Sequence, residues 1–235
     1  MSDPSAYVQG LAAAVVEASR VQPGDSVAGF GPNTTGGTLI RPGGRQCYPA
    51  FWIRDFAMSL ESGLIEPEEA LHALMLTAGT QAAEDRRVPS GSLVPGGAIA
   101  DHISFGSVPI FFPGVLDDAE NQGGPRWPVP SLDDHYYFVE MAWHVVLATG
   151  RHELLRSTVD GILLIDRLER AFAVPPVDEC TGLVTCGAQD RGVSFGFTDV
   201  VEHTGHLLFC SILRLQAARR MADLLQRLGA TSDAE

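Results

Sequence analysis

The sequence predicts an all-α protein made of helical hairpins that pack as an array or a toroid. Two observations lead to this fold class. Stretches with apolar residues at helical spacing recur along the chain, and their links alternate between turns of a few residues and long loops rich in glycine and proline. Helices joined by short turns bury their apolar faces against each other, so a series of such pairs forms an α-helical array.

Six helices are expected, with boundaries set by capping residues, prolines and glycines. Their approximate ranges are 4–20, 50–63, 66–78, 132–150, 151–173 and 199–229. The links at Gly63 and Gly150 are short, which predicts one hairpin between the second and third helices and another between the fourth and fifth. Minor β-structure is expected in loops, as a short strand near 38–40 and a small hairpin that joins 180–186 with 193–195.

A single domain is expected to cover residues 1–235, because a chain of this length with 45% hydrophobic residues can bury one substantial core. Within it, residues 85–131 form a long connection, and a loop of this length in a compact domain is usually functional. It carries Asp101-His102 and an acidic run, Asp117-Asp118-Ala119-Glu120. The acidic run lacks the ligand spacing of a calcium-binding EF-hand loop, so we expect no metal there.

The charge of the chain excludes several classes of function. A net charge of −13 disfavours nucleic acid and anionic membrane surfaces as partners, since both attract cationic patches. All 16 basic residues are arginine, which excludes Schiff-base chemistry and the lysine of a phosphate-binding loop. The sequence shows no apolar run long enough to cross a membrane and no signal-peptide pattern, so we expect a cytoplasmic protein.

Four cysteines are too few for a disulfide-based scaffold at this length. Cys180 and Cys186 flank a turn and could pair across it. Cys47 and Cys210 fit small core positions instead.

Two histidine-containing patterns stand out on the expected helices. Residues 202–206 (Glu-His-Thr-Gly-His) could form a metal-binding face, supply a histidine that orients a carboxylate, or form a solvated helix face. Glu140 and His144, four residues apart, read as a structural pair. Because no set of residues has zinc-ligand spacing, we expect neither a metal nor a cofactor.

The stretch Pro42–Phe56 carries the densest mixture of aromatic and charged residues. The aromatic residues are Tyr48, Phe51, Trp52 and Phe56, and they interleave with Arg45, Arg54 and Asp55. Flat apolar rings beside groups that can form paired hydrogen bonds make the mixture that a sugar pocket needs. A helix start with core aromatics and one surface ion pair explains the same residues, and the sequence leaves both interpretations open.

Three expected helix starts place carboxylates beside aromatic residues. They are Asp55 beside Trp52, Asp133-Asp134 before Tyr136-Tyr137, and Asp199 after Phe195-Gly196-Phe197-Thr198. Glycoside hydrolysis needs one carboxylic acid to protonate the leaving oxygen and one carboxylate to activate water, about 6.5–9.5 Å apart in the inverting geometry. Shielding by aromatic rings raises the pKa of a carboxyl group, which suits the acid. Helix capping is the competing explanation for each aspartate.

Pro42-Gly43-Gly44-Arg45, followed by aromatics and Trp52-Ile53-Arg54-Asp55, resembles the Pro-Gly-Gly-Arg and Trp-Asp signature of trehalase-like enzymes. The Trp-x-Arg-Asp form is similar to glucoamylase-type and oligosaccharide-glucosidase-type members of the six-hairpin glycosidase superfamily. Residues 195–199 (Phe-Gly-Phe-Thr-Asp) resemble the segment that carries the general-acid aspartate in trehalase-like members. The resemblance covers about residues 42–65 and 130–229.

This resemblance implies an (α/α)6 toroid that binds a carbohydrate substrate and hydrolyses a glycosidic bond by an inverting acid/base mechanism. The implied substrate-binding residues are Arg45, Trp52, Arg54, Asp55, Asp134, His135 and Tyr136, and the implied general acid is Asp199. A complete toroid has twelve helices, so six correspond to its N-terminal half, and self-association could cover the open face. Two alternatives remain: a non-catalytic carbohydrate-binding or truncated toroid protein, and epimerase or lyase chemistry at His102, His135 or Tyr136.

Overall fold

The computed structural model describes residues 4–27, 31–44, 48, 50–87, 93–111, 131–187 and 203–232. Its α-helices are α1 (Pro4–Ser19), α2 (Ile53–Ser59), α3 (Pro67–Thr80), α4 (Asp134–Thr149), α5 (Leu164–Ala173) and α6 (Leu208–Ser232). Short 3-10 helices are η1 (Pro42–Gly44), η2 (Leu60–Ser62) and η4 (His152–Arg156). The strands are β1 (Arg20–Val21), β2 (Leu39–Ile40), β3 (Ala50–Trp52), β4 (Arg86–Arg87), β5 (Leu93–Val94), β6 (His102–Ser104), β7 (Pro109–Ile110), β8 (Thr158–Val159), β9 (Ile162–Leu163), β10 (Thr185–Cys186) and β11 (Gly205–His206).

Helices and several small sheets together make this a mixed α/β protein, so the prediction of an all-α, incomplete (α/α)6 toroid is wrong. In the described residues, the strands pair as four two-stranded sheets and one three-stranded sheet, β3-β6-β7. Each strand is only two or three residues long. A stretch this short cannot show the alternation of apolar and polar residues that marks a strand. Most of these strands are therefore expected from the sequence as loops or as parts of longer helices, as at 50–63 and 151–173.

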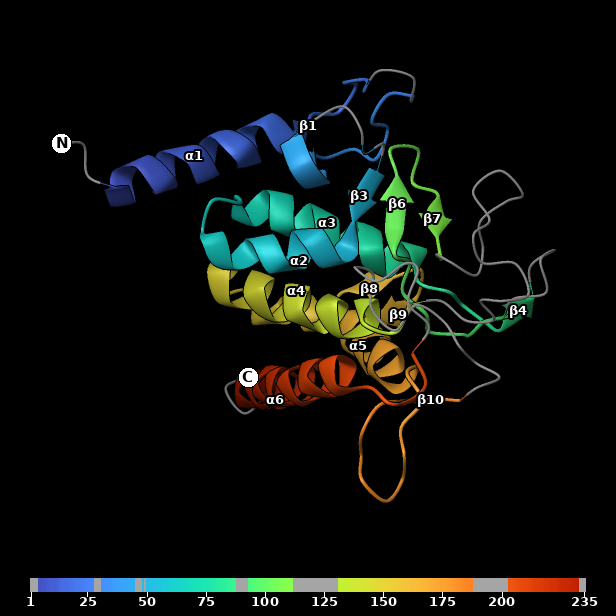
Figure 1. Cartoon of the computed structure of the whole chain (residues 1–235). Coiled ribbons are helices and arrows are strands. Elements are labelled where there is room, and N and C mark those ends of the chain that lie inside the picture. Colours follow the sequence, from blue (N-terminus) through green and yellow to red (C-terminus); the bar gives the residue numbers. More distant parts are fainter. Residues whose placement is uncertain are drawn as a thin grey trace.

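Helix α4 lies at the centre of the helical layer. It packs against α2, α3, α5 and α6, and Figure 1 shows α2 and α3 on one side of it and α5 and α6 on the other. Every residue from Asp134 to Ala142 is buried. The first half of α4 is therefore buried on all sides, and a helical stretch of this kind carries polar residues only where they find partners. Asp134, His135 and Glu140 are such residues.

Residues 151–173, expected as one helix, instead form η4, the hairpin β8–β9 and then α5. Asp160 and Gly161 make the two-residue turn of this hairpin, with φ angles of 49° and 77°. A type I′ turn requires positive φ at both positions, and an Asp-Gly pair favours it. The expected hairpin between the fourth and fifth helices is therefore interrupted by a β-hairpin, for which the Asp-Gly pair is the local signal.

Two other expected helices are shorter than predicted. The segment 50–63 begins as β3 and continues as α2 and η2, and the last helix begins at Leu208. Strand β10, within 180–186, pairs with β11, while 193–195 lies outside the described residues. Other predictions are confirmed: β2 lies near 38–40, and Gly63 and Gly150 end η2 and α4 with φ of 68°.

The long connection 85–131 is anchored by the sheet β3-β6-β7. Strand β6 pairs with β3 so that Trp52 lies opposite His102. The ladder continues at the N–H of Ile53, which donates to the carbonyl of Asp101 at 3.1 Å. Asp101 and His102 are therefore held beside the start of α2. Residues 112–130 of the connection, including the acidic run, lie outside the described residues.

Two further features bear on membranes and on the cysteines. In the described part of the chain, no helix combines the length and the apolar character needed to cross a bilayer. Cys180 is exposed, Cys186 is buried, and the two form no disulfide with each other. Cys210 is a buried core residue, as predicted, and Cys47 lies outside the described residues.

Candidate functional site

A buried cluster of charges joins the start of α2 to the start of α4. Arg54 is 2% exposed, and Asp133 and Asp134 are fully buried. Arg54 donates from Nε to Asp133 Oδ2 at 2.6 Å and from Nη2 to Asp133 Oδ1 at 3.0 Å, a two-point pairing. The same Nη2 lies 3.0 Å from Asp134 Oδ2, 3.2 Å from Asp101 Oδ1 and 3.1 Å from Ser131 Oγ. We name these five residues the Arg54 cluster.

The Arg54 cluster sets one guanidinium against three carboxyl groups, and the pKa values of Asp134 and Asp101 move in opposite directions. Burial, with added repulsion from Asp133 and Asp101, raises the pKa of Asp134 well above its usual range, although Arg54 opposes this. Asp134 Oδ1 has no hydrogen-bond partner among the described residues, a state that costs a neutral carboxyl group less than a carboxylate. Burial also acts on Asp101, but the hydrogen bond from His102 and the charge of Arg54 outweigh it and lower its pKa.

Three aromatic side chains, those of His102, Trp52 and Tyr48, form a chain of ring contacts from the Arg54 cluster to the solvent-exposed surface. His102 Nδ1 lies 2.8 Å from Asp101 Oδ2, and the His102 ring stacks on Trp52 with centroids 4.4 Å apart and planes 16° apart. This stack follows from the register of β3 and β6, which sets the two residues opposite each other. Tyr48, 43% exposed, meets Trp52 edge-on at 5.3 Å. Trp52 and His102 are half-buried, so part of the stack faces solvent.

Asp55 is the partly accessible carboxyl group on the first turn of α2, three residues after Trp52. Burial is the main reason that its pKa is raised; the charge of Arg54 opposes the shift, and those of Asp101 and Asp133 add to it. Asp55 therefore keeps its proton to a higher pH than a free aspartate does. A half-buried carboxyl group of this kind can both donate and accept hydrogen bonds to a polar ligand.

The structure brings together part of the predicted site and leaves two of its residues outside the described ranges. The residues that lie in the Arg54 cluster or on the adjoining turn of α2 are Trp52, Arg54, Asp55 and Asp134. Arg45 and Asp199 lie outside the described residues, so their roles stay predictions.

His135 and Tyr136, also predicted for the site, are buried in α4. His135 Nδ1 lies 3.2 Å from the carbonyl oxygen of Leu132, and burial lowers its pKa to about 4, so the ring is neutral at pH 7. Tyr136 packs edge-on against Phe172 with centroids 5.8 Å apart, and burial raises its pKa to about 12. Both side chains lie in the packed interior next to the Arg54 cluster.

Sequence reasoning missed Asp101 and Ser131 as partners of Arg54 and offered capping as an explanation for Asp133. Asp133 is the N-cap residue of α4, yet its side chain makes no capping hydrogen bond, because both of its oxygens accept from Arg54. The local signal for Asp101 is its position directly after the buried run Ala98–Ala100. A carboxylate next to such a run needs a partner, although the sequence does not say which.

Comparisons with known protein families and curated proteins do not assign the chain to a family. No family model matches the chain, and no curated protein matches it significantly. Chemically, the site offers a half-exposed aromatic stack, a carboxyl group with a raised pKa and a rigid buried ion network behind them. These features fit the binding of a small ligand that has both an apolar face and several hydroxyl groups.

Proposed function

We propose that the protein binds a carbohydrate at the surface formed by Trp52, His102 and Asp55 and hydrolyses a glycosidic bond there. The observation that carries the proposal is the half-exposed stack of Trp52 on His102, beside the carboxyl group of Asp55, which has a raised pKa and lies on the first turn of α2. The stacked rings offer an apolar face to a sugar ring, and Asp55 offers hydrogen bonds to its hydroxyl groups. The resemblance of residues 42–56 to six-hairpin glycosidases supports the same class of substrate.

Hydrolysis needs a proton donor for the leaving oxygen and a carboxylate that activates water. In this proposal Asp199 is the general acid, on the strength of its Phe-Gly-Phe-Thr-Asp context. Asp55 and Trp52 hold the sugar. Arg54 is a positioning residue, because its ion pairs with Asp133 and Asp134 hold the first turn of α2 against α4.

The test combines binding by titration calorimetry with turnover by release of reducing sugar, over a panel of disaccharides and oligosaccharides. Trp52→Ala should weaken binding about fivefold or more, if the sugar face stacks on the ring as strongly as a nucleic-acid base does, which contributes about 1–3 kcal/mol. Tyr7→Ala removes an exposed aromatic residue of α1 and is the matched control, with binding unchanged. Asp199→Asn should abolish turnover and leave binding intact. A panel with neither binding nor turnover contradicts the proposal.

The alternative is a carbohydrate-binding protein without catalysis. One observation favours it: the carboxyl groups of Asp101, Asp133 and Asp134 are buried and engaged with Arg54, so among the described residues of this site Asp55 is the accessible carboxyl group. Inverting hydrolysis requires two such groups. Calorimetric binding of a sugar without turnover of any glycoside, unchanged in Asp199→Asn, would establish this alternative.

A further inference from the structure

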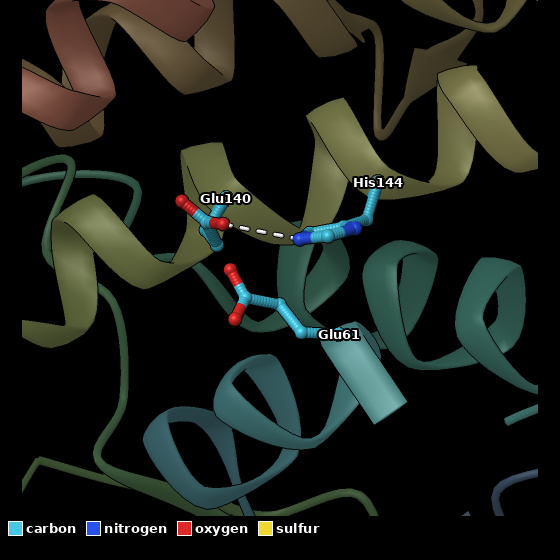
Figure 2. Close-up of side chains that lie close together, drawn as sticks. All are labelled: Glu61, Glu140 and His144. Atoms are coloured by element: carbon cyan, nitrogen blue, oxygen red, sulfur yellow. Dashed lines mark hydrogen bonds and ion pairs between the residues drawn. The ribbon is translucent and has the colours of Figure 1, made fainter. Parts of the chain in front are cut away.

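Glu61, Glu140 and His144 converge where η2 meets the middle of α4. Figure 2 shows the three side chains pointing toward one another, with Glu140 and His144 one turn apart on α4 and Glu61 approaching from η2. One ligand atom from each side chain lies within 4.8 Å of the other two, and His144 Nε2 lies 3.1 Å from Glu140 Oε1. Glu140 is 8% exposed and Glu61 is exposed, so the group is open to solvent on one side.

We propose that Glu61, Glu140 and His144 bind a divalent transition-metal ion such as zinc, with water in the remaining position. Ligand atoms on a tetrahedral zinc lie about 3.3 Å apart, since the bonds are about 2.0–2.1 Å long. Glu140 and His144 already have this separation, and the exposed Glu61 closes the remaining distance by rotating its side chain. The imidazole nitrogen distinguishes the group from a surface cluster of acids and favours zinc over calcium and magnesium, which take oxygen ligands.

The surroundings of Glu140 hold its carboxylate in position. Gln216 Nε2 lies 3.5 Å from Glu140 Oε2, and Arg220 forms an ion pair with Glu140 while its guanidinium lies 4.3 Å from the centre of the Trp143 ring. A contact such as that of Gln216 to the second oxygen orients a ligating carboxylate. Two carboxylates against one arginine leave a net negative charge, which attracts a cation. Arg220 also competes for Glu140, so its removal should strengthen metal binding.

The proposed ion acts as a second clamp between the segment α2–η2 and α4. Arg54, at the start of α2, binds Asp133 and Asp134 at the start of α4. Glu61 follows the end of α2 and reaches Glu140, further along α4. The two helices therefore run in the same direction and meet at both ends of α2. An ion at the second contact fixes the helix that carries Trp52 and Asp55 at its start, and this holds whatever ligand those residues bind.

The test is titration of the chelator-treated protein with zinc chloride in a calorimeter, together with its melting temperature. We expect one zinc ion per chain and a rise in melting temperature on binding. Glu61→Gln removes an exposed ligand and should weaken zinc binding at least about tenfold. Glu179→Gln, at an exposed position elsewhere, is the matched control with wild-type affinity. Arg220→Gln should tighten zinc binding by about tenfold, because a competing charge near the ion is removed.

Three results would overturn the proposal. The first is the absence of zinc binding to the wild-type protein. The second is an unchanged zinc affinity in Glu61→Gln, which would place the ion elsewhere, for instance on the exposed thiol of Cys180. The third is tighter binding of calcium or magnesium than of zinc, which would remove His144 from the ligand set. His144→Ala, checked for folding by circular dichroism, should lose as much zinc affinity as Glu61→Gln.

Discussion

The Arg54 cluster and the Glu61–Glu140–His144 group both connect the α2 segment to α4, yet their charges are satisfied in different ways. In the Arg54 cluster, the guanidinium and its three carboxyl partners are all buried, and each carboxyl group forms an ion pair with the guanidinium. In the second group, Glu140 and His144 lie within hydrogen-bond distance of each other, and the exposed Glu61 approaches them from the solvent side. A fully buried ion network is inaccessible to an incoming ligand. In a partly exposed group, a metal ion can replace the water that contacts the exposed carboxylate.

This difference has an energetic consequence. Removing one member of a buried ion network leaves the other charges desolvated and unpaired, which costs several kcal/mol. Removing an exposed carboxylate lets water replace it, which costs little. The Arg54 cluster is therefore best understood as the rigid support behind Trp52 and Asp55, and variants at the two contacts should differ sharply in their effect on stability.

The largest effect is expected for Arg54→Met, which leaves Asp101 and Asp133 buried without their cation. The free energy of unfolding should fall by about 3–5 kcal/mol, as it does when one partner of a buried ion pair is removed. Urea unfolding followed by circular dichroism measures this. Arg151→Gln, which breaks the exposed pair with Glu153, is the control and should change stability little. A loss for Arg54→Met no larger than that of the control would show that the network is not structural.

An intermediate, pH-dependent effect is expected for Asp134→Asn. Burial raises the pKa of Asp134 in the folded protein above its unfolded value. Its contribution to stability is therefore fully present below the unfolded pKa, about 3.9, and is lost as the pH rises through the folded pKa. Asparagine stays neutral, so the stability of the variant relative to wild type should increase as the pH rises. Urea unfolding across a pH series measures the difference, and a difference that is constant with pH contradicts the assignment.

For Asp101→Asn, in the same cluster, we expect the stability difference from wild type to change with pH in the opposite direction. The pKa of Asp101 is lowered in the folded protein despite burial, because His102 and Arg54 favour its carboxylate. Its contribution to stability is present above its unfolded pKa and is lost as the pH falls through its folded pKa. The destabilisation by Asp101→Asn should therefore be largest near neutral pH and shrink in acid.

The smallest effect is expected for Glu61→Gln in the presence of a chelator. Glu61 is exposed and lies at the solvent side of its group, so the free energy of unfolding without metal should change by no more than about 0.5 kcal/mol. Thermal and urea unfolding of the chelator-treated protein check this. A loss of unfolding free energy comparable to that of Arg54→Met would mean that Glu61 belongs to a second structural network. The two contacts would then not differ in their effect on stability.

Local sequence patterns correctly predicted the helix ends that are set by residues adjacent in the chain. The glutamate and proline at 66–67 start α3, where Glu66 and Glu69 form the capping box, and glycines at 63 and 150 end their helices in the left-handed conformation. The same patterns failed at most strands of two or three residues, as at β8 and β9. Such short strands are defined by pairing with a partner strand and not by their own periodicity.

By itself, the sequence determined the approximate positions of the helices α1, α3 and α4 and the acidic composition without lysine. It also placed Trp52, Arg54 and Asp55 next to one another at the start of one helix. Only the tertiary structure decided that Arg54 faces inward to Asp101 and Asp133, that Trp52 stacks on His102, and that Glu61 meets Glu140 and His144. The physical reason is that these partners are distant along the chain. Strand register and helix packing bring them together, and neither is encoded in the spacing of residues within one segment.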